Sequence, residues 1–175
     1  YGGAGKVPLE AGQARFGNSV DGFNDLVART EQVVASLPTD CRVGIAPHSL
    51  RATSPDDLAA VLQSYSSGPK HIHIAEQPKE VVDITAWLGA RPVEWLLDNV
   101  EVGKDWCLIH ATHMTDVETN NMAKSGAVAG LCPITEANLG DGSFNGPSYL
   151  ADGGAFGVGS DSNVLISLTE ELRTL

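Results

Sequence analysis

The chain has 175 residues, of which 42% are hydrophobic and 19% are charged, and this balance fits a folded globular protein rather than a disordered one. Its formal net charge of −11 argues against nucleic acid or an anionic membrane as a partner, because both attract basic surfaces. No apolar run approaches the roughly 20 residues that cross a bilayer, and the first residues lack the pattern of a signal peptide.

Hydrophobic periodicity predicts strands that alternate with helices along the whole chain. The predicted strands cover residues 42–48, 71–75, 106–110, 128–132 and 156–159. The predicted helices cover residues 19–36, 54–65, 79–99 (with a turn at 89–92), 116–124, 147–152 and a last segment from residue 170. The Gly-rich composition of residues 1–18 and the polar composition of residues 133–146 predict loops. Such alternation is typical of βαβ units and a parallel sheet.

The cysteines bear on the cellular compartment. Cys41, Cys107 and Cys132 are far apart and lack CxxC spacing. Each lies in an apolar, strand-like run, so we expect reduced thiols in the core. Reduced thiols favour a cytoplasmic location.

Several predicted strands end at residues that can bind a metal or transfer a proton. His73 and Glu76 lie at the end of the second strand. His110 ends the third strand, and Asp161 follows the fifth. Because the carboxyl ends of the strands meet at one rim of a parallel α/β barrel, we expect these side chains to converge there. Imidazole and carboxylate are zinc ligands and also proton carriers, so the pattern predicts a metal-dependent hydrolytic site.

Taken singly, each of these residues also has a structural interpretation. His73 and Glu76 could be hydrogen-bonded polar residues near a barrel mouth, and His110 could be a structural histidine. Asp161 could cap the turn that follows it. The metal-site interpretation is favoured because three separate strand ends would otherwise carry such residues by coincidence.

His48 and Arg51 form a second candidate group after the first predicted strand. The planar arginine fork pairs with a carboxylate through two hydrogen bonds, so the pair predicts a small-molecule substrate that carries carboxylates. The structural alternative is a surface salt bridge, because Arg51 is close in sequence to Asp56 and Asp57.

These motifs resemble the amidohydrolase superfamily, and within it the formimidoylglutamate deiminase family. The resemblance covers nearly the whole chain and rests on Pro-His-Ser-Leu-Arg-Ala (47–52), His-Ile-His-Ile-Ala-Glu-Gln-Pro-Lys-Glu (71–80), Trp-Cys-Leu-Ile-His-Ala-Thr-His (106–113), Ser-Gly-Ala-Val-Ala-Gly-Leu-Cys (125–132), Thr-Glu-Ala-Asn-Leu-Gly-Asp-Gly (135–142) and Gly-Ser-Asp-Ser (159–162). It implies an α/β fold, namely a partial (β/α)8 TIM barrel of the metal-dependent amidohydrolase type that covers roughly strands 4 to 8.

The resemblance also implies a reaction, the zinc-dependent hydrolysis of N-formimidoyl-L-glutamate to N-formyl-L-glutamate and ammonia in histidine degradation. His73 would be a metal ligand. Asp161 would be a second ligand that also takes a proton from the attacking water. Glu76 would carry this proton toward the departing amine, and His110 would polarise or steady the tetrahedral centre. Besides Zn²⁺, one imidazole with one carboxylate accommodates Fe²⁺ or Mn²⁺.

The same resemblance implies that His48 and Arg51 hold the carboxylates of the substrate. Family members also carry a His-x-His pair on the first barrel strand as two further metal ligands. This chain has no such pair in that place, because His71-x-His73 belongs to a later strand.

A complete barrel needs about 250 residues. We therefore expect residues 1–175 to be a single incomplete amidohydrolase barrel domain, an internal fragment without the first strands and the C-terminal small β domain. We expect this fragment to bind zinc weakly and to be inactive alone, and the full-length parent to be a homodimeric enzyme.

Two other functions stay open. A related aminohydrolase of the guanine or triazine type would act on a neutral heterocycle, which has no carboxylate to pair with the guanidinium group of Arg51. A non-catalytic barrel remnant would act through association, because the exposed strand edges of a half-barrel favour pairing with another chain.

Overall fold

The computed structural model describes residues 7–65 and 67–175. Residues 1–6 of the predicted N-terminal loop lie outside this part of the chain. The chain divides into two compact units, residues 1–71 and residues 72–175. Among the helices of the described residues, none combines the length and the apolar composition needed to cross a membrane.

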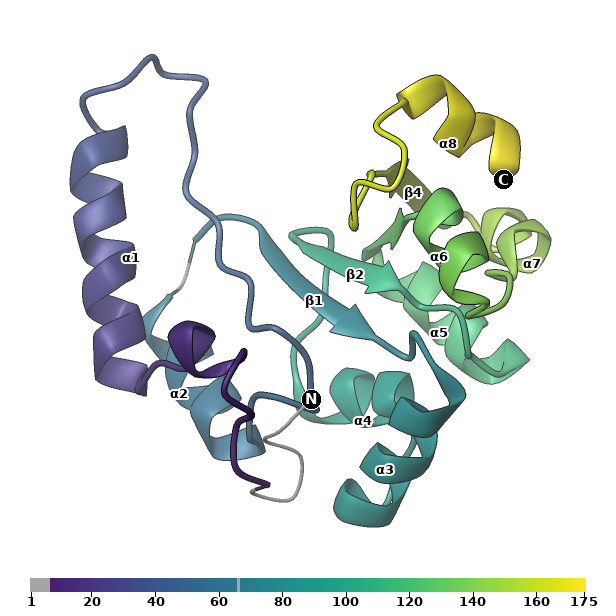
Figure 1. Ribbon diagram of the computed structural model, residues 1–175, viewed down its shortest axis with the longest axis horizontal. Helices are drawn as coiled ribbons and strands as arrows, with labels where there is room; N and C mark the ends of the chain where they lie inside the picture. The colour runs from purple at the N-terminus through teal and green to yellow at the C-terminus, as the bar shows by residue number, and fades with distance from the viewer. Residues whose placement is uncertain (1–6, 66) are drawn as a thin grey trace. The chain divides into compact units, whose positions relative to one another are not determined.

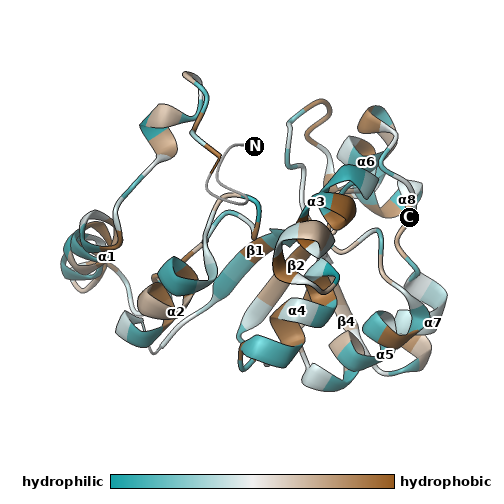
Figure 2. Ribbon diagram, turned by 90° about the horizontal axis from the view of Figure 1, so that it is seen from below, coloured by the Kyte–Doolittle hydropathy of each residue, from teal (hydrophilic) through white to brown (hydrophobic). Residues whose placement is uncertain are grey.

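The first unit contains two predicted helices, α1 (Val20–Val34) and α2 (Pro55–Ser64), after a short 3-10 turn at Ala14–Phe16. The Ser19 hydroxyl accepts a hydrogen bond from the first turn of α1, and Ser54 does the same for α2. Apolar residues gather on one side of α1 (Figure 2). This side packs on a small core made of Ile45, Val61 and Tyr65, together with Val20, Phe23, Val27 and Leu62.

The prediction of a strand over residues 42–48 is wrong in length, because only Ile45 pairs with another segment. The backbone of residues 42–48 forms a single parallel bridge, between Ile45 and Lys70. Pro47 has no N–H group to extend the ladder, and Gly44 lies so close to Pro69 that an added Cβ would be 2.8 Å from the Pro69 carbonyl oxygen. Cys41, predicted to be a core residue, is exposed, because the chain before the bridge joins no sheet.

The second unit is built on a four-stranded sheet with the order β1-β2-β3-β4 (Figure 1). The pairs β2–β3 and β3–β4 are parallel. The strands are β1 (Lys70–Ile74), which begins in the first unit, β2 (Trp106–His110), β3 (Val128–Leu131) and β4 (Ala155–Val158). These strands confirm the predicted α/β class.

Helices follow the strands of the second unit in the predicted alternation. They are α3 (Pro78–Leu88), α4 (Pro92–Asn99), α5 (Asp116–Ser125), α6 (Pro133–Leu139), α7 (Gly146–Ala151) and α8 (Leu168–Thr174). Within this unit α3 packs on α4, α4 on α5, and α5 on α7. The loop predicted for residues 133–146 is wrong in its first half, which forms α6. Pro133 in the first turn and Gly140 at φ 71° after the last turn are ordinary helix boundaries.

Burial alternates along β1 and separates the apolar core from the candidate site. Ile72 and Ile74 are buried, whereas His71 is exposed and His73 is partly buried on the opposite face. Burying an isoleucine side chain contributes about 1.5–3 kcal/mol, so the helix-covered face stabilises the sheet. On β1 the other face carries the polar side chains of His71 and His73.

Candidate functional site

The candidate site lies where the strands of the second unit end. His73 is on β1, Glu76 follows β1, and His110 is the last residue of β2. The ring centroids of His73 and His110 are 5.7 Å apart, and His110 Nε2 lies 3.7 Å from Glu76 Oε1. The structure therefore brings together three of the residues that the sequence analysis selected.

Asp161 reaches the same end of the sheet from the segment after β4. The Gly159 N–H donates to the Leu131 carbonyl at the end of β3, at 3.0 Å, and the Ser162 N–H donates to Thr135 Oγ1 at 3.3 Å. The Asp161 carboxylate is close enough for its charge to raise the pKa of His110. Asp161 therefore lies near enough to His110 for the two side chains to interact electrostatically.

The backbone is strained at these strand ends. Non-glycine residues with positive φ, among those that the structure describes, are Ala75 (51°), His110 (68°), Ala111 (48°), Asp161 (41°) and Asn163 (57°). Each such conformation costs on the order of 1–3 kcal/mol and persists only where the surroundings hold it. Strain of this kind is concentrated at functional sites, and here it coincides with the predicted rim.

Two buried glutamates that the sequence analysis missed hold the strained backbone. Glu80 is 1% exposed, and its two carboxylate oxygens accept the Ala75 N–H at 2.9 Å and the Glu76 N–H at 3.0 Å. Glu136 Oε1 accepts the Cys132 N–H at 3.0 Å and also lies 3.1 Å from His110 Nδ1. One sequence signal could have found both glutamates, since each lies in the first turn of a helix that begins with proline.

The charge state of His110 follows from these neighbours. Burial lowers the pKa of His110, but the hydrogen bond with Glu136 and the charges of Glu76, Glu136 and Asp161 together outweigh burial and raise this pKa above its ordinary value. The surrounding carboxylates also create a negative potential at the rim, and such a potential attracts a cation.

Asp141 is a further acidic group beside the site that the sequence analysis did not select. Its side chain is buried, with 5% exposed, and its carbonyl oxygen lies 2.6 Å from His113 Nε2. Burial raises the pKa of the Asp141 carboxyl, a hydrogen bond with Gln77 lowers it, and the Glu76 charge raises it again, with a raised pKa as the result.

One cluster of possible metal donors occurs within residues 7–65 and 67–175. His110, Cys132 and Glu136 offer ligand atoms within 4.8 Å of one another. Glu136 Oε1 already accepts the Cys132 N–H, and burial, followed by the charge of Asp161, raises the pKa of the Cys132 thiol to about 12. Because a thiol binds metal as the thiolate, this cluster is better explained as internal support for the strand ends.

The predicted metal ligands, His73 and Asp161, lie outside that cluster. They contribute an imidazole and a carboxylate to an acidic rim, a donor set and a potential that fit a divalent cation. Catalytic zinc usually takes three protein ligands, so this pair is one donor short. The assignment of a metal to His73 and Asp161 stays a prediction.

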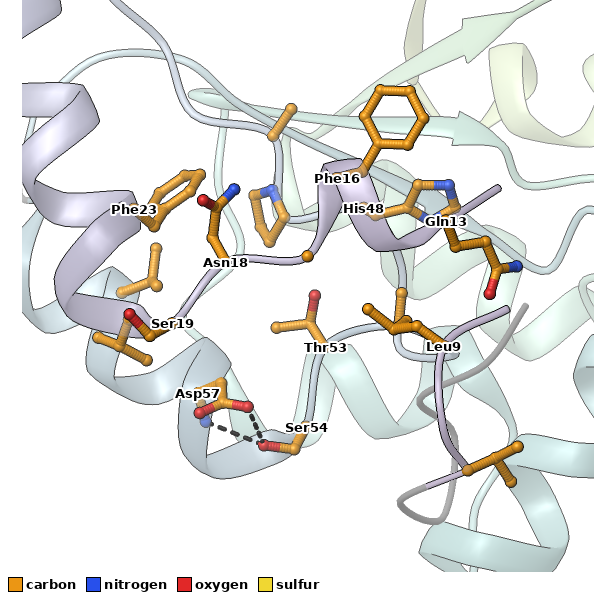
Figure 3. Close-up of a pocket in the computed structure, with 17 residues that line it drawn as sticks. Leu9, Gln13, Phe16, Asn18, Ser19, Phe23, His48, Thr53, Ser54 and Asp57 are labelled. Atoms are coloured by element: carbon orange, nitrogen blue, oxygen red, sulfur yellow. Dashed lines mark hydrogen bonds between the residues drawn. The ribbon is translucent and has the colours of Figure 1, made fainter. Parts of the chain in front are cut away.

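The predicted substrate-binding residues lie in the first unit. His48 is partly buried, its Nδ1 is 2.9 Å from Ser49 Oγ, and its ring lines a cavity of about 690 Å³ (Figure 3). Apolar groups such as Leu9, Phe16 and Phe23 form much of the cavity wall. Arg51 is partly buried and is not part of this wall. The role of both residues in substrate binding stays a prediction.

Known proteins resemble the chain over most of its length. Residues 21–175 match the amidohydrolase family. The chain is 48% identical, over its whole length, to formimidoylglutamate deiminase from Pseudomonas aeruginosa, and it spans 38% of that protein.

Solved structures show the same relationship. An amidohydrolase from Brucella melitensis matches 100% of this chain with a TM-score of 0.95 and 53% identity, over 39% of its own chain. A zinc-bound adenosine deaminase from Xanthomonas campestris matches 84% of this chain with a TM-score of 0.74, over 35% of its own chain. Its identity of 23% shows a shared fold alone. The four-stranded sheet is thus part of the barrel fold that the sequence predicted.

Proposed function

Because the chain belongs to the amidohydrolase family, we propose that the protein is a metal-dependent hydrolase that converts N-formimidoyl-L-glutamate and water to N-formyl-L-glutamate and ammonia. The observation that carries this proposal is the convergence of His73, Glu76 and His110 at the ends of β1 and β2. The 48% identity to a formimidoylglutamate deiminase supports this substrate. Since the chain spans 38% of that relative, the activity is proposed for the full-length protein.

We assign the metal to His73 and Asp161, with at least one further ligand from elsewhere in the full-length protein. Zinc is the first choice because a structure of similar fold holds zinc, and Fe²⁺ or Mn²⁺ would suit the same donors. When bound, such a metal acts as a Lewis acid and lowers the pKa of a coordinated water to about 7.

The rim residues would move the protons of the reaction. Asp161 takes a proton as water adds to the amidine carbon, and Glu76 carries it to the nitrogen that departs as ammonia. The remaining proton of the hydroxyl group on the tetrahedral centre then passes to the same nitrogen as the C–N bond breaks, so that ammonia departs and the carbonyl of the formyl product forms. In its protonated form, which the raised pKa favours, His110 would donate a hydrogen bond from Nε2 to the tetrahedral centre.

His48 and Arg51 would bind the substrate carboxylates. The negative rim repels a dianion, and a guanidinium fork would offset this repulsion by pairing with a substrate carboxylate through two hydrogen bonds. We also propose that the full-length protein is a cytoplasmic homodimer, which analytical ultracentrifugation and cell fractionation would test.

The decisive experiment measures ammonia released by the full-length protein from N-formimidoyl-L-glutamate, guanine, adenosine and a chlorotriazine. We expect turnover of the first compound alone, lost after chelation and restored by Zn²⁺. Arg51→Met should raise KM for N-formimidoyl-L-glutamate strongly. Faster turnover of a neutral heterocycle, unaffected by Arg51→Met, would show that the protein is an aminohydrolase of another specificity.

A further inference from the structure

The two ring nitrogens of His110 face two different carboxylates. Nδ1 lies 3.1 Å from Glu136 Oε1 and Nε2 lies 3.7 Å from Glu76 Oε1. The side chain of His110 is 1% exposed and that of Glu136 is 6% exposed, so water does not compete freely for their contact. Glu136 therefore approaches the ring from the side that does not face Glu76.

The hydrogen bonds of Glu136 decide which nitrogen of the ring carries the proton. Glu136 Oε1 accepts the backbone N–H of Cys132 at 3.0 Å. A backbone N–H can only donate, so Oε1 is an acceptor and His110 Nδ1 must be the donor in the second hydrogen bond. When the ring is neutral, its lone pair is then on Nε2.

The fold places Glu136 for this contact. It lies in the first turn of α6, where the Glu136 N–H donates to the Cys132 carbonyl at 2.9 Å and α6 begins directly after β3. His110 has a left-handed backbone at φ 68°, which other contacts must hold in place. One carboxylate oxygen thus ties the end of β3 to the ring at the end of β2.

We propose that Glu136 is a positioning residue that fixes the orientation and the Nδ1–H tautomer of His110, so that Nε2 is presented to the reacting group. The catalytic meaning of this role rests on the proposed function, in which His110 contacts the tetrahedral centre. The tautomer itself does not depend on that function. Groups that orient metal-binding imidazoles typically change affinity or activity about 10–100-fold when they are replaced, and we expect an effect of this order for Glu136.

The experiment compares Glu136→Gln with the wild type in the full-length protein, using ¹⁵N NMR of the histidine rings and steady-state kinetics. At a pH at which the ring is neutral, the wild type should show His110 protonated at Nδ1 and not at Nε2. Glu136→Gln replaces a pure acceptor by a group that can also donate, so the Nε2–H tautomer should become populated. We expect kcat to fall about 10–100-fold with KM little changed, and Glu136→Asp to retain the Nδ1–H tautomer.

Glu171→Gln is the matched control, because Glu171 is fully buried and accepts the Ile134 N–H at 2.9 Å but does not contact His110. It should leave the His110 tautomer and kcat unchanged. An Nε2–H tautomer in the wild type, or equal losses of kcat in both variants, would overturn the proposal. If the wild type does not hydrolyse N-formimidoyl-L-glutamate, the proposed function fails, while the tautomer in wild type and variants still decides the role of Glu136.

Discussion

Replacing Glu80 tests how the rim backbone is held. This carboxylate is 1% exposed and accepts the N–H groups of Ala75 and Glu76 at 2.9 and 3.0 Å. Ala75 has φ 51°, so the same carboxylate stabilises a strained residue. Glu80→Gln keeps the shape of the side chain but leaves a single acceptor oxygen for the two donors.

The expected loss follows from these two hydrogen bonds. A hydrogen bond to a charged group contributes about 1.5–3 kcal/mol, and Glu80→Gln removes one acceptor, so we expect a loss of about 1.5–3 kcal/mol in the free energy of unfolding. Glu80→Ala leaves the buried Ala75 N–H and the part-buried Glu76 N–H without their carboxylate and should lose up to twice as much. Because 1.4 kcal/mol corresponds to a factor of ten, the Ala75 and Glu76 amides should exchange roughly 10–100-fold faster.

The assay is amide hydrogen exchange read by NMR, with urea denaturation of the same full-length variants. Glu94→Gln serves as the control, because Glu94 accepts the Arg91 N–H at 3.3 Å on an exposed surface. This control should change stability by no more than about 0.5 kcal/mol. Unchanged exchange at Ala75 and Glu76 in Glu80→Gln would refute the argument that this carboxylate holds the strand end.

Other predictions concern the cysteines, the sheet and the metal. Burial, with the Asp161 charge as the next cause, raises the pKa of Cys132 to about 12, so at pH 8 mass spectrometry should find iodoacetamide on exposed Cys41 and not on Cys132. Labelling of Cys41 and Cys132 at the same rate would contradict the raised pKa of Cys132. Since this folded-state pKa lies above the ordinary 9.0, the contribution of the Cys132 thiol to stability is complete below pH 9.0 and is lost as the pH rises toward about 12. Gly130→Ala should cost about 1–3 kcal/mol by overpacking, because its Cβ would lie 2.7 Å from Cys107 Sγ; a double-mutant cycle with Cys107→Ala should recover most of this loss, and simple additivity would argue against the clash. His73→Ala should remove the metal from the full-length protein, as measured by elemental analysis, and the isolated 175-residue chain should show no chelator-sensitive turnover.

The sequence predicted that candidate residues would lie together where their positions depend on strand order alone. His73, Glu76 and His110 could be grouped because the ends of neighbouring parallel strands meet at one edge of a sheet. Glu80 and Glu136 could not be found this way, because they are on helices. Their contacts depend on backbone turns that bring a first-turn carboxylate back onto the preceding strand end.

The errors in secondary structure also have physical causes. The composition of residues 42–48 is that of a strand, but Pro47 and the close approach of Gly44 to Pro69 limit pairing to one bridge. Polar composition hid α6, although Pro133 and Gly140 mark its boundaries. Composition is averaged over a segment, whereas one proline or glycine decides where the backbone can pair or turn.

The carboxylates that hold the strand ends belong to helices, whereas the groups assigned to the chemistry belong to the strands and the loops after them. Glu80 and Glu136 accept hydrogen bonds from backbone N–H groups, which every rim residue other than proline provides. A rim side chain such as Glu76 can therefore be exchanged with little loss of scaffold stability. This division of labour would let one barrel diverge toward new substrates, and it recommends the rim rather than the first helical turns as the place to vary in directed evolution.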